Sequence, residues 1–462
     1  MNGITKSNRY NYGLGTVGRD MLYTMVSVYL IFYLTDILNL PDSTMWAMTG
    51  ALTVLRIFDA VNDPFMGYLV DNTHSRFGKF KPWIAIGGII GGILTVLLFT
   101  DLGLAGTGYV ISFVILYLAW DFTYGANDIA YWSMLPSLTT DQKEREKTGA
   151  FARICANVGM YIVVVGILPI TEALGGDKRA WFLLAVGVAV FTLVFLCFTL
   201  FGVRENRNLY KKEETTSLKE MFKVLFKNDQ LLFTAISMAL FMIGYSITTT
   251  FGVYFFKYAY KDEGMYSVFA GVLGISQLLA LALFPIFSKR YSRRQLYAFS
   301  TVLVVAGYLV FFLSPMKIIP IGIAGVLIFI GQAFIQLLML VFLADTVEYG
   351  QWKLGRRNES ITFSVQPFIN KIGGALGNSI VGVTLIVSGI NSAATPEDVT
   401  PEGLLIMKLA MLILPLIIIV AGYIIYHFKF KIDKKMFDRI LAELDERGDF
   451  SPKDSEIGYA GK

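Results

Sequence analysis

Charges, histidines and cysteines are all scarce in this chain, and each scarcity excludes a class of protein. Only 16% of the 462 residues are charged, against 55% hydrophobic, whereas soluble proteins carry about 25% charged residues. The two cysteines, Cys155 and Cys197, lie in apolar stretches, which excludes a disulfide framework. Two histidines are too few to suggest a histidine-based metal site. No Gly-rich phosphate-binding loop occurs, so ATP is not the direct energy source of this chain.

Long uncharged runs take the place of these features. "PWIAIGGIIGGILTVLLFT" has no charge in nineteen residues, and "AWFLLAVGVAVFTLVFLCFTLFGV" has none in twenty-four. About twenty such residues span a bilayer as a helix, so the sequence predicts a multi-pass membrane protein. The start "MNGITKSNRYNYG" lacks an early apolar core, and we therefore expect no cleavable signal peptide.

The apolar runs predict twelve spans. They lie near 12–38, 46–70, 82–100, 109–138, 151–172, 180–201, 230–258, 266–287, 296–313, 321–348, 360–387 and 404–427. The loops after even-numbered spans hold twenty Lys and Arg, and those after odd-numbered spans hold five when Lys257, at the end of the seventh span, is counted with them. Positive residues stay in the cytoplasm, so both termini are expected there, in the cytoplasmic membrane. The net charge of +5 follows from this rule and does not indicate nucleic acid.

The chain reads as two parallel halves. Basic loops recur at matching places: "DNTHSRFGKFK" against "SKRYSRRQ", and "TTDQKEREKTGAFAR" against "GQWKLGRRNESITFS". This predicts an all-α membrane protein with two pseudo-symmetric six-helix bundles, the major facilitator architecture with a central site. The expected parts are a first bundle at 1–201, a cytoplasmic middle loop at 202–229, a second bundle at 230–427 and a cytoplasmic tail at 428–462. A short helix is expected in the tail at "DKKMFDRILAELDERG".

The second span carries acids that an apolar helix would ordinarily exclude. A charge at the bilayer centre costs at least ~2.5–3.5 kcal/mol, and such residues usually mark a transport pathway. Asp59 and Asp63 are four residues apart and Asn62 shares their face. These oxygens suit a hard cation such as Na⁺, and paired carboxylates equally suit a proton. The alternative is a structural network with Arg56, and for Arg56 itself we favour that role.

Further polar residues in other spans indicate a sugar site. Arg19 and Asp20 lie in the first span, while Tyr124, Asp128 and Trp132 repeat every four residues along one face of the fourth. An aromatic ring beside a carboxylate suits a sugar, because the ring stacks on its C–H faces and the carboxylate accepts hydroxyl hydrogen bonds. Two cations complete this set: Arg153 in the fifth span and Lys371 in the eleventh.

Four stretches of the chain together resemble a known family. "YGLGTVGRD", "DAVNDPFMGYLVDNTHSRFGKFKPW", "YWSMLPSLTTDQKERE" and "FSVQPFINK" are similar to the glycoside–pentoside–hexuronide:cation symporters. The resemblance covers essentially the whole chain. It implies the twelve-helix facilitator fold and uptake of a glycoside coupled to Na⁺, Li⁺ or H⁺, with no other cofactor.

The resemblance also assigns roles to individual residues. Cation ligands match Asp59, Asn62 and Asp63. Sugar-site residues match Arg19, Asp20, Asp128, Trp132, Arg153 and Lys371. Two threonines near the cation in the family's best-known member are Gly125 and Pro367 here. The loss of both hydroxyl oxygens puts sodium selectivity in doubt and leaves Na⁺ and H⁺ open. Asp121 stands where that member has no acid.

The loops of the two halves suggest a cytoplasmic gate. "DQKEREKTG" contains Arg145, and "GQWKLGRRNES" contains Arg357 and Glu359. Glu348 lies at the end of the tenth span. We expect Arg145 to pair with Glu348 or Glu359 when the cavity faces outward, as part of a network of individually weak pairs. The alternative is that these are solvated charges that obey the positive-inside rule.

The sequence therefore predicts a secondary active importer of a glycoside or related sugar, working by alternating access in symport with a cation. Two alternatives stay open: a lipid or lysolipid carrier of the same fold, and a sugar sensor that does not transport. No nucleophile–base arrangement indicates an enzyme. The expected partners are a small sugar and membrane lipid, and we expect a monomer.

Overall fold

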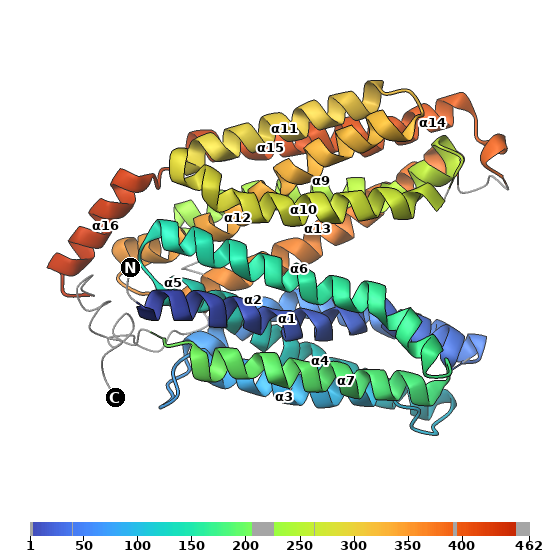
Figure 1. Cartoon of the computed structure of the whole chain (residues 1–462), viewed down its shortest axis with the longest axis horizontal. Helices are drawn as coiled ribbons and strands as arrows, with labels where there is room; N and C mark the ends of the chain where they lie inside the picture. The colour runs from blue at the N-terminus through green and yellow to red at the C-terminus, as the bar shows by residue number, and fades with distance from the viewer. Residues whose placement is uncertain (1–2, 39, 206–225, 263, 391–394, 450–462) are drawn as a thin grey trace. The chain divides into compact units, whose positions relative to one another are not determined.

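The computed structural model is built of helices (Figure 1). It describes residues 3–38, 40–205, 226–262, 264–390 and 395–449, within which no β-strand occurs. The side chains of Arg56 and Asp59 lie outside the described residues, as do most of the middle loop and the end of the tail.

The helices of the first half follow the predicted spans closely. They are α1 (Gly3–Phe32), α2 (Asp42–Asp71), α3 (Lys81–Leu98), α4 (Gly106–Ser133), α5 (Leu135–Leu138), α6 (Gln142–Ala173) and α7 (Lys178–Cys197). Wider turns extend α1 over Tyr33–Ile37 and α7 over Phe198–Gly202.

The helices of the second half follow in the same way. They are α9 (Asp229–Tyr254), α10 (Gly264–Arg290), α11 (Arg293–Leu313), α12 (Ile318–Leu354), α13 (Glu359–Val387), α14 (Pro401–Lys408) and α15 (Leu414–Lys429). Wider turns continue α9 over Phe255–Ala259 and join α14 to α15 over Leu409–Ile413. The short helix expected in the tail is confirmed as α16 (Lys434–Glu446).

Ten of these described segments are long and apolar enough to cross a bilayer. The other two predicted spans are α1 and α2, each 30 residues long. Their mean hydropathy is lowered by the same residues that indicate a polar pathway, among them Arg19, Asp20 and Asp63. The twelve-helix fold is therefore present, and its two least apolar spans carry part of the candidate site.

Two predicted loops are partly helical. The stretch Gln142–Ala150 is the start of α6, because the Asp141 carboxylate accepts the N–H groups of Lys143 and Glu144 as an N-cap. Gly350–Leu354 continues α12, and the turn at 355–358 follows, where Gly355 has a φ of +74°. The charged residues in these two stretches led to the prediction of loops. In the structure they lie on helical turns that extend beyond the apolar spans.

The chain divides into two compact units. The first contains residues 1–224 together with 350–364 and 441–462, and the second contains 225–349 and 365–440. In the first unit α1 lies against α6 and α7, while α4 lies against α2 and α3. The α1–α6 approach is so close that a Cβ at Gly159 would collide with the carbonyl oxygen of Val17. Small residues allow membrane helices to approach in this way.

The second unit has a separate core. α9 packs along α15, and α11 also lies against α15. Aromatic rings fill the junction near one end, where Tyr426 meets Tyr297 at a centroid distance of 4.6 Å and Phe342 at 4.7 Å. Of the ten candidate spans α12 is the most buried, with 72% of its most apolar window inside the molecule.

Candidate functional site

Two carboxylates from different helices of the first unit hold one buried arginine. The Arg19 guanidinium lies 2.8 Å from Asp20 Oδ2 and 2.5 Å from Asp128 Oδ1. Arg19 is 7% exposed, whereas the two acids are 22% and 21% exposed. A buried cation needs such partners, because an unpaired charge in a low-dielectric interior is costly. The structure therefore brings together three of the predicted site residues, with the acids more accessible than the arginine.

A reciprocal tyrosine contact fixes the two helices that carry these acids. The Tyr12 hydroxyl donates to the carbonyl of Tyr131 at 2.9 Å, and the Tyr131 hydroxyl donates to the carbonyl of Tyr12. Their rings stack with centroids 4.8 Å apart. This contact holds α1 and α4 in register about two turns from Arg19 and about one turn from Asp128.

Trp132 links this ion pair to a second arginine. Its indole Nε1 donates to Asp128 Oδ1 at 3.1 Å, and the Arg153 guanidinium lies over its ring at 4.4 Å from the centroid. Arg19 lies 5.1 Å from the same ring. Trp132 is 5% exposed, so its ring is covered here by cations. Arg153 Nε is buried without a hydrogen-bond partner, which leaves a strong donor next to the acids.

An aromatic surface lies beside the acids, and of its members the sequence analysis identified only Tyr124. This ring packs against Tyr23, at 4.9 Å, and Trp120, at 5.4 Å, and those two rings lie 6.4 Å from each other. Tyr23 is 44% exposed. Its position one turn after Arg19 on α1 is a spacing signal that could have identified it. An exposed ring is what stacking on a ligand requires, and Tyr23 supplies one.

The predicted cation ligands lie on α2. Asn62 and Asp63 are 7% and 2% exposed. About one turn later Met66 packs against Ala126 and Ile129, so this part of α2 lies next to α4, the helix of Asp128. Among the described residues no group of three acids, histidines or cysteines is placed to hold a metal. Because the side chain of Asp59 lies outside them, the predicted set of Asp59, Asn62 and Asp63 stays a prediction.

Two positions of α4 bear on that prediction. Asp121 is buried, at 7% exposure. A Cβ added at Gly125 would meet no atom within 4 Å. The space beside Gly125 is therefore open.

The second unit contributes polar groups in apolar helices. Lys371 is half-buried in α13, four residues after Pro367. Gln332 of α12 is 1% exposed, and neither its amide oxygen nor its amide nitrogen has a hydrogen-bond partner. Buried polar groups are almost always paired, so an unpaired amide inside this apolar helix is unusual. An amide within an apolar run was its only sequence signal.

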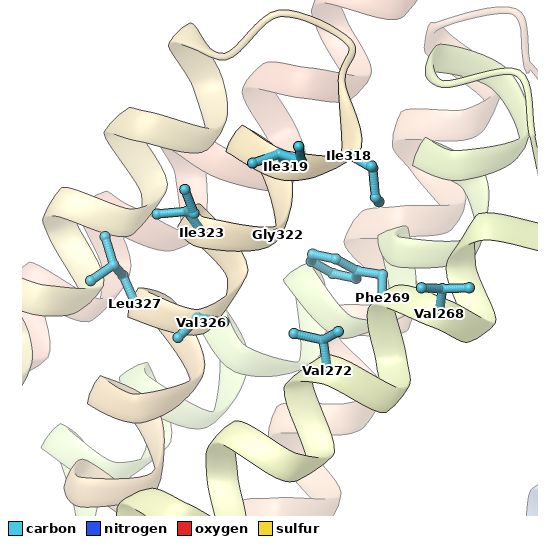
Figure 2. Close-up of a pocket in the computed structure, with 9 residues that line it drawn as sticks. All are labelled: Val268, Phe269, Val272, Ile318, Ile319, Gly322, Ile323, Val326 and Leu327. Atoms are coloured by element: carbon cyan, nitrogen blue, oxygen red, sulfur yellow. The ribbon is translucent and has the colours of Figure 1, made fainter.

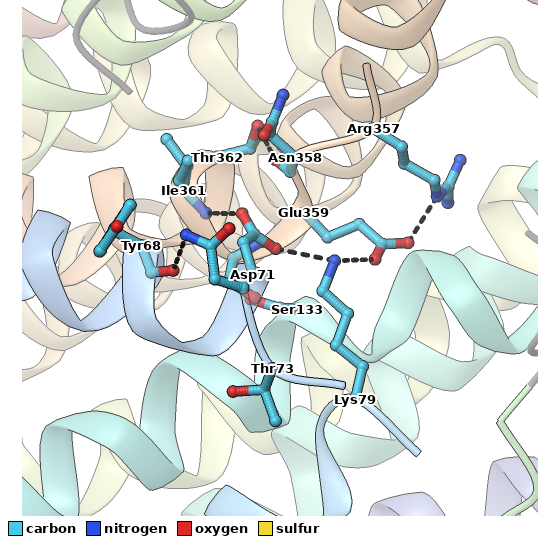
Figure 3. A network of polar contacts seen from close by, with 12 residues as sticks. Tyr68, Asp71, Thr73, Lys79, Ser133, Arg357, Asn358, Glu359, Ile361 and Thr362 are labelled. Atoms are coloured by element: carbon cyan, nitrogen blue, oxygen red, sulfur yellow. Dashed lines mark hydrogen bonds and ion pairs between the residues drawn. The ribbon is translucent and has the colours of Figure 1, made fainter. Parts of the chain in front are cut away.

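A buried ion network lies at the end of the first unit that the charge pattern assigns to the cytoplasm (Figure 3). Lys79 Nζ lies 2.9 Å from Asp71 and 3.5 Å from Glu359, and Glu359 accepts from Arg357 at 2.6 Å. Lys79 is 2% exposed and Glu359 is fully buried. Asp71 and Glu359 come from opposite halves of the sequence, yet one lysine joins them.

The same network caps α13. The two oxygens of Asp71 accept the N–H groups of Ser360 at 3.0 Å and Ile361 at 2.8 Å. Free N–H groups and the helix dipole favour an anion at a helix N-terminus. On the other side of the lysine, Glu205 accepts the backbone N–H of Lys79 at 2.9 Å. The α2–α3 loop is thereby tied to the first turn of α13.

The remaining predicted gate residues are also buried. Arg145 is fully buried, and its guanidinium donates to the carbonyls of Thr139 at 2.9 Å and Pro136 at 3.2 Å. Glu348, in the second unit, is fully buried as well. The pairing of Arg145 with Glu348 or Glu359 stays a prediction. The sequence analysis did not single out Asp71 and Lys79, because nothing in the sequence shows which distant helix they meet.

Comparison with known proteins decides the family. The family model described as "MFS/sugar transport protein" matches residues 11–434. The chain belongs to this family. The family expected from the sequence motifs is thereby confirmed. This MFS/sugar transport protein is also a multi-pass membrane protein, in agreement with its apolar helices.

Individual relatives agree over nearly the whole chain. A raffinose carrier protein of Pediococcus pentosaceus is 34% identical over 455 residues, which cover 95% of this chain and 71% of that protein. A lactose permease of Lactobacillus delbrueckii subsp. bulgaricus is 33% identical over 452 residues, covering 95% and 72%. The solved fucose:proton symporter FucP of E. coli has a TM-score of 0.65 at 11% identity, covering 93% and 98%. This last likeness shows the major facilitator fold alone.

Proposed function

We propose that the protein is a secondary active transporter that imports a sugar, of the glycoside class, in symport with a cation. The observation that carries the proposal is the cluster of Arg19, Asp20 and Asp128, a partly accessible ion network inside a membrane bundle. Membrane helices retain such groups where they serve a transport pathway. The raffinose and lactose carriers among the relatives support a sugar as substrate.

The site residues divide into acceptors, donors and an aromatic surface. Asp20 and Asp128 accept hydrogen bonds from sugar hydroxyls, and Arg153 donates through its unpaired Nε. Trp132 positions Asp128 through its indole N–H. The exposed stack of Tyr23 on Tyr124, described above, provides the ring face for the sugar. Lys371 is a predicted further donor, which the resemblance to the symporter family assigns to the sugar site.

The charge of the cluster favours an uncharged substrate. Among the residues of the first unit, two guanidinium groups, Arg19 and Arg153, stand against two carboxylates, Asp20 and Asp128, so the formal charges of these four groups cancel. A neutral polyhydroxylated ligand adds no net charge to a desolvated site, whereas an unpaired ion would be costly there.

Coupling is assigned to Asp59, Asn62 and Asp63 on α2. The ion is Na⁺ or H⁺, and Li⁺ would follow Na⁺. The open space at Gly125 and the proline at 367 supply no hydroxyl ligand, which weakens an oxygen cage for Na⁺ and favours a proton shared by the carboxylates.

Alternating access requires a gate that breaks reversibly. The network of Asp71, Lys79, Arg357 and Glu359 closes the cytoplasmic end, with Arg145 and Glu348 as its predicted extension. On this proposal the protein lies in the cytoplasmic membrane with both termini in the cytoplasm and functions as a monomer. Its bundles are 1–201 and 230–427, joined by the middle loop 202–229 and followed by the tail 428–462.

Paired variants in proteoliposomes test the proposal. Asp63→Asn should abolish gradient-driven accumulation of a labelled galactoside but retain sugar binding, because it removes only the coupling carboxylate. Asp128→Asn should lose binding itself. Asp101→Asn, at an exposed loop acid, is the matched control and should accumulate sugar normally. Normal accumulation by both Asp63→Asn and Asp128→Asn would refute the assignment.

A further inference from the structure

An apolar groove runs between α10 and α12 in the second unit (Figure 2). Its lining comes from residues 268–272 of α10 and 318–327 of α12, and every side chain in it is a hydrocarbon. Its volume is about 400 Å³, within the range of roughly 300–1,000 Å³ that ligand pockets occupy. An acyl chain fits such a lining, whereas a sugar finds no hydrogen-bonding side chain in it.

The groove has a rigid floor and an open side. Phe269 is 5% exposed and is held by Phe256, at 5.0 Å, and Phe311, at 6.0 Å. In contrast Ile319 is 73% exposed and Ile323 is 56% exposed. The groove therefore opens sideways from these helices, where a membrane protein meets lipid.

Gly322 provides part of the hollow. It lines the groove, and a Cβ added there would meet no atom within 4 Å. A larger side chain at this position would extend into the groove without a clash, which makes it a site for filling the groove by substitution.

A cation lies next to the groove in the sequence. Lys317 directly precedes the lining residues of α12, and its side chain is exposed. Among the described residues no carboxylate pairs with it, as is also the case for Arg179 and Lys257, whereas Lys178 and Lys261 on the same predicted outer face pair with Asp101 and Glu397. The positive-inside rule disfavours lysine on the outer face, so a lysine there without a carboxylate calls for a counterion.

We propose that the groove of α10 and α12 binds one acyl chain of an anionic phospholipid, with the lipid phosphate on Lys317. Both halves of the ligand are matched: the lining accepts hydrocarbon, and the lysine supplies charge complementarity to the headgroup. The site lies within the second unit, so it is separate from the cluster of Arg19, Asp20 and Asp128.

Native mass spectrometry tests this proposal on the full chain. Protein is released from vesicles of equal phosphatidylglycerol and phosphatidylethanolamine, and the lipid adducts are counted. A basic residue near a membrane surface contributes about 1 kcal/mol toward anionic lipid, so Lys317→Gln should lower phosphatidylglycerol retention about five-fold relative to phosphatidylethanolamine. Gly322→Leu should reduce retention of both lipids.

Two matched variants serve as controls. Lys178→Gln removes an outer cation that is already paired, and Gly187→Leu fills open space on α7; both should retain lipid as the unmodified chain does. Equal phosphatidylglycerol retention in Lys317→Gln would overturn the proposal, and this surface change tests it even if Gly322→Leu misfolds. A dimer that Gly322→Leu converts to a monomer, with no lipid lost, would also overturn it and make the groove an interface between two copies.

Discussion

Removing the Asp71 carboxylate should open the cytoplasmic end of the transporter. Asp71→Ala deletes the acceptor for the N–H groups of Ser360 and Ile361 and the closer partner of Lys79. Breaking a buried ion pair costs about 3–5 kcal/mol. Glu359 still lies 3.5 Å from the lysine, so the lower figure applies. About 3 kcal/mol corresponds to a roughly 150-fold shift of the equilibrium away from the closed state.

Spin labels at two exposed positions near this network would measure the shift. Positions 74, on the α2–α3 loop, and 353, at the end of α12, are exposed. In Asp71→Ala the distance distribution between them should move to longer values, and uphill transport should fall while sugar binding is retained. Asp71→Asn, which keeps one acceptor oxygen, should give a smaller shift.

The control variant is Asp101→Ala. Its partner Lys178 is half-exposed, and such pairs contribute only about 0–1 kcal/mol. If Asp71→Ala leaves both the distances and uphill transport unchanged, the network is not the gate.

Three other side chains give expectations that single variants can check. Asp128→Asn should weaken sugar binding ten-fold to several-hundred-fold by calorimetry, since each charge-assisted hydrogen bond contributes ~1.5–3 kcal/mol; unchanged affinity would misplace the site. Gln332→Leu should raise the free energy of unfolding by about 1–3 kcal/mol, because it removes a buried unpaired amide. The same variant should transport sugar more slowly. A lower free energy of unfolding would contradict this expectation. The hydrogen bond from Lys178 and that from the Gly103 N–H lower the pKa of Asp101. The ionised carboxylate therefore stabilises the folded state at pH values above the unfolded pKa of about 3.9. That stabilisation is lost as the pH falls through the lower pKa of the folded state. Lys178→Met should therefore cost at most about 1 kcal/mol in melting experiments at pH 7, and progressively less as the pH falls below about 4; a cost that grows on acidification would contradict the pairing.

The sequence predicted the spans because bilayer crossing imposes a length and a composition that a single helix must satisfy. The predicted helix ends were wrong where a helix continues beyond the apolar region. Residues Gln142–Ala150 are mostly polar, yet they belong to α6, which begins at the Asp141 cap. Composition reports the membrane boundary, and capping determines where a helix begins.

Partners within the site were harder to predict than its members. Arg19 and Asp128 are 109 residues apart, and Lys79 and Glu359 are 280 apart. Periodicity places residues on one helix face but does not say which helix faces it. The expected sugar surface on Trp132 stays a prediction, because Arg153 covers that ring in this structure, and Tyr23 offers an exposed ring beside the acids.

The most direct test of sugar–cation symport is accumulation in proteoliposomes made from the purified chain. Labelled galactosides and related neutral glycosides are supplied outside, under an imposed inward gradient of Na⁺, of H⁺ or of neither. The account predicts accumulation of at least one sugar above its external concentration under one cation gradient only, and equilibration without a gradient. Accumulation that ignores both gradients, or no sugar flux across the panel, would contradict it.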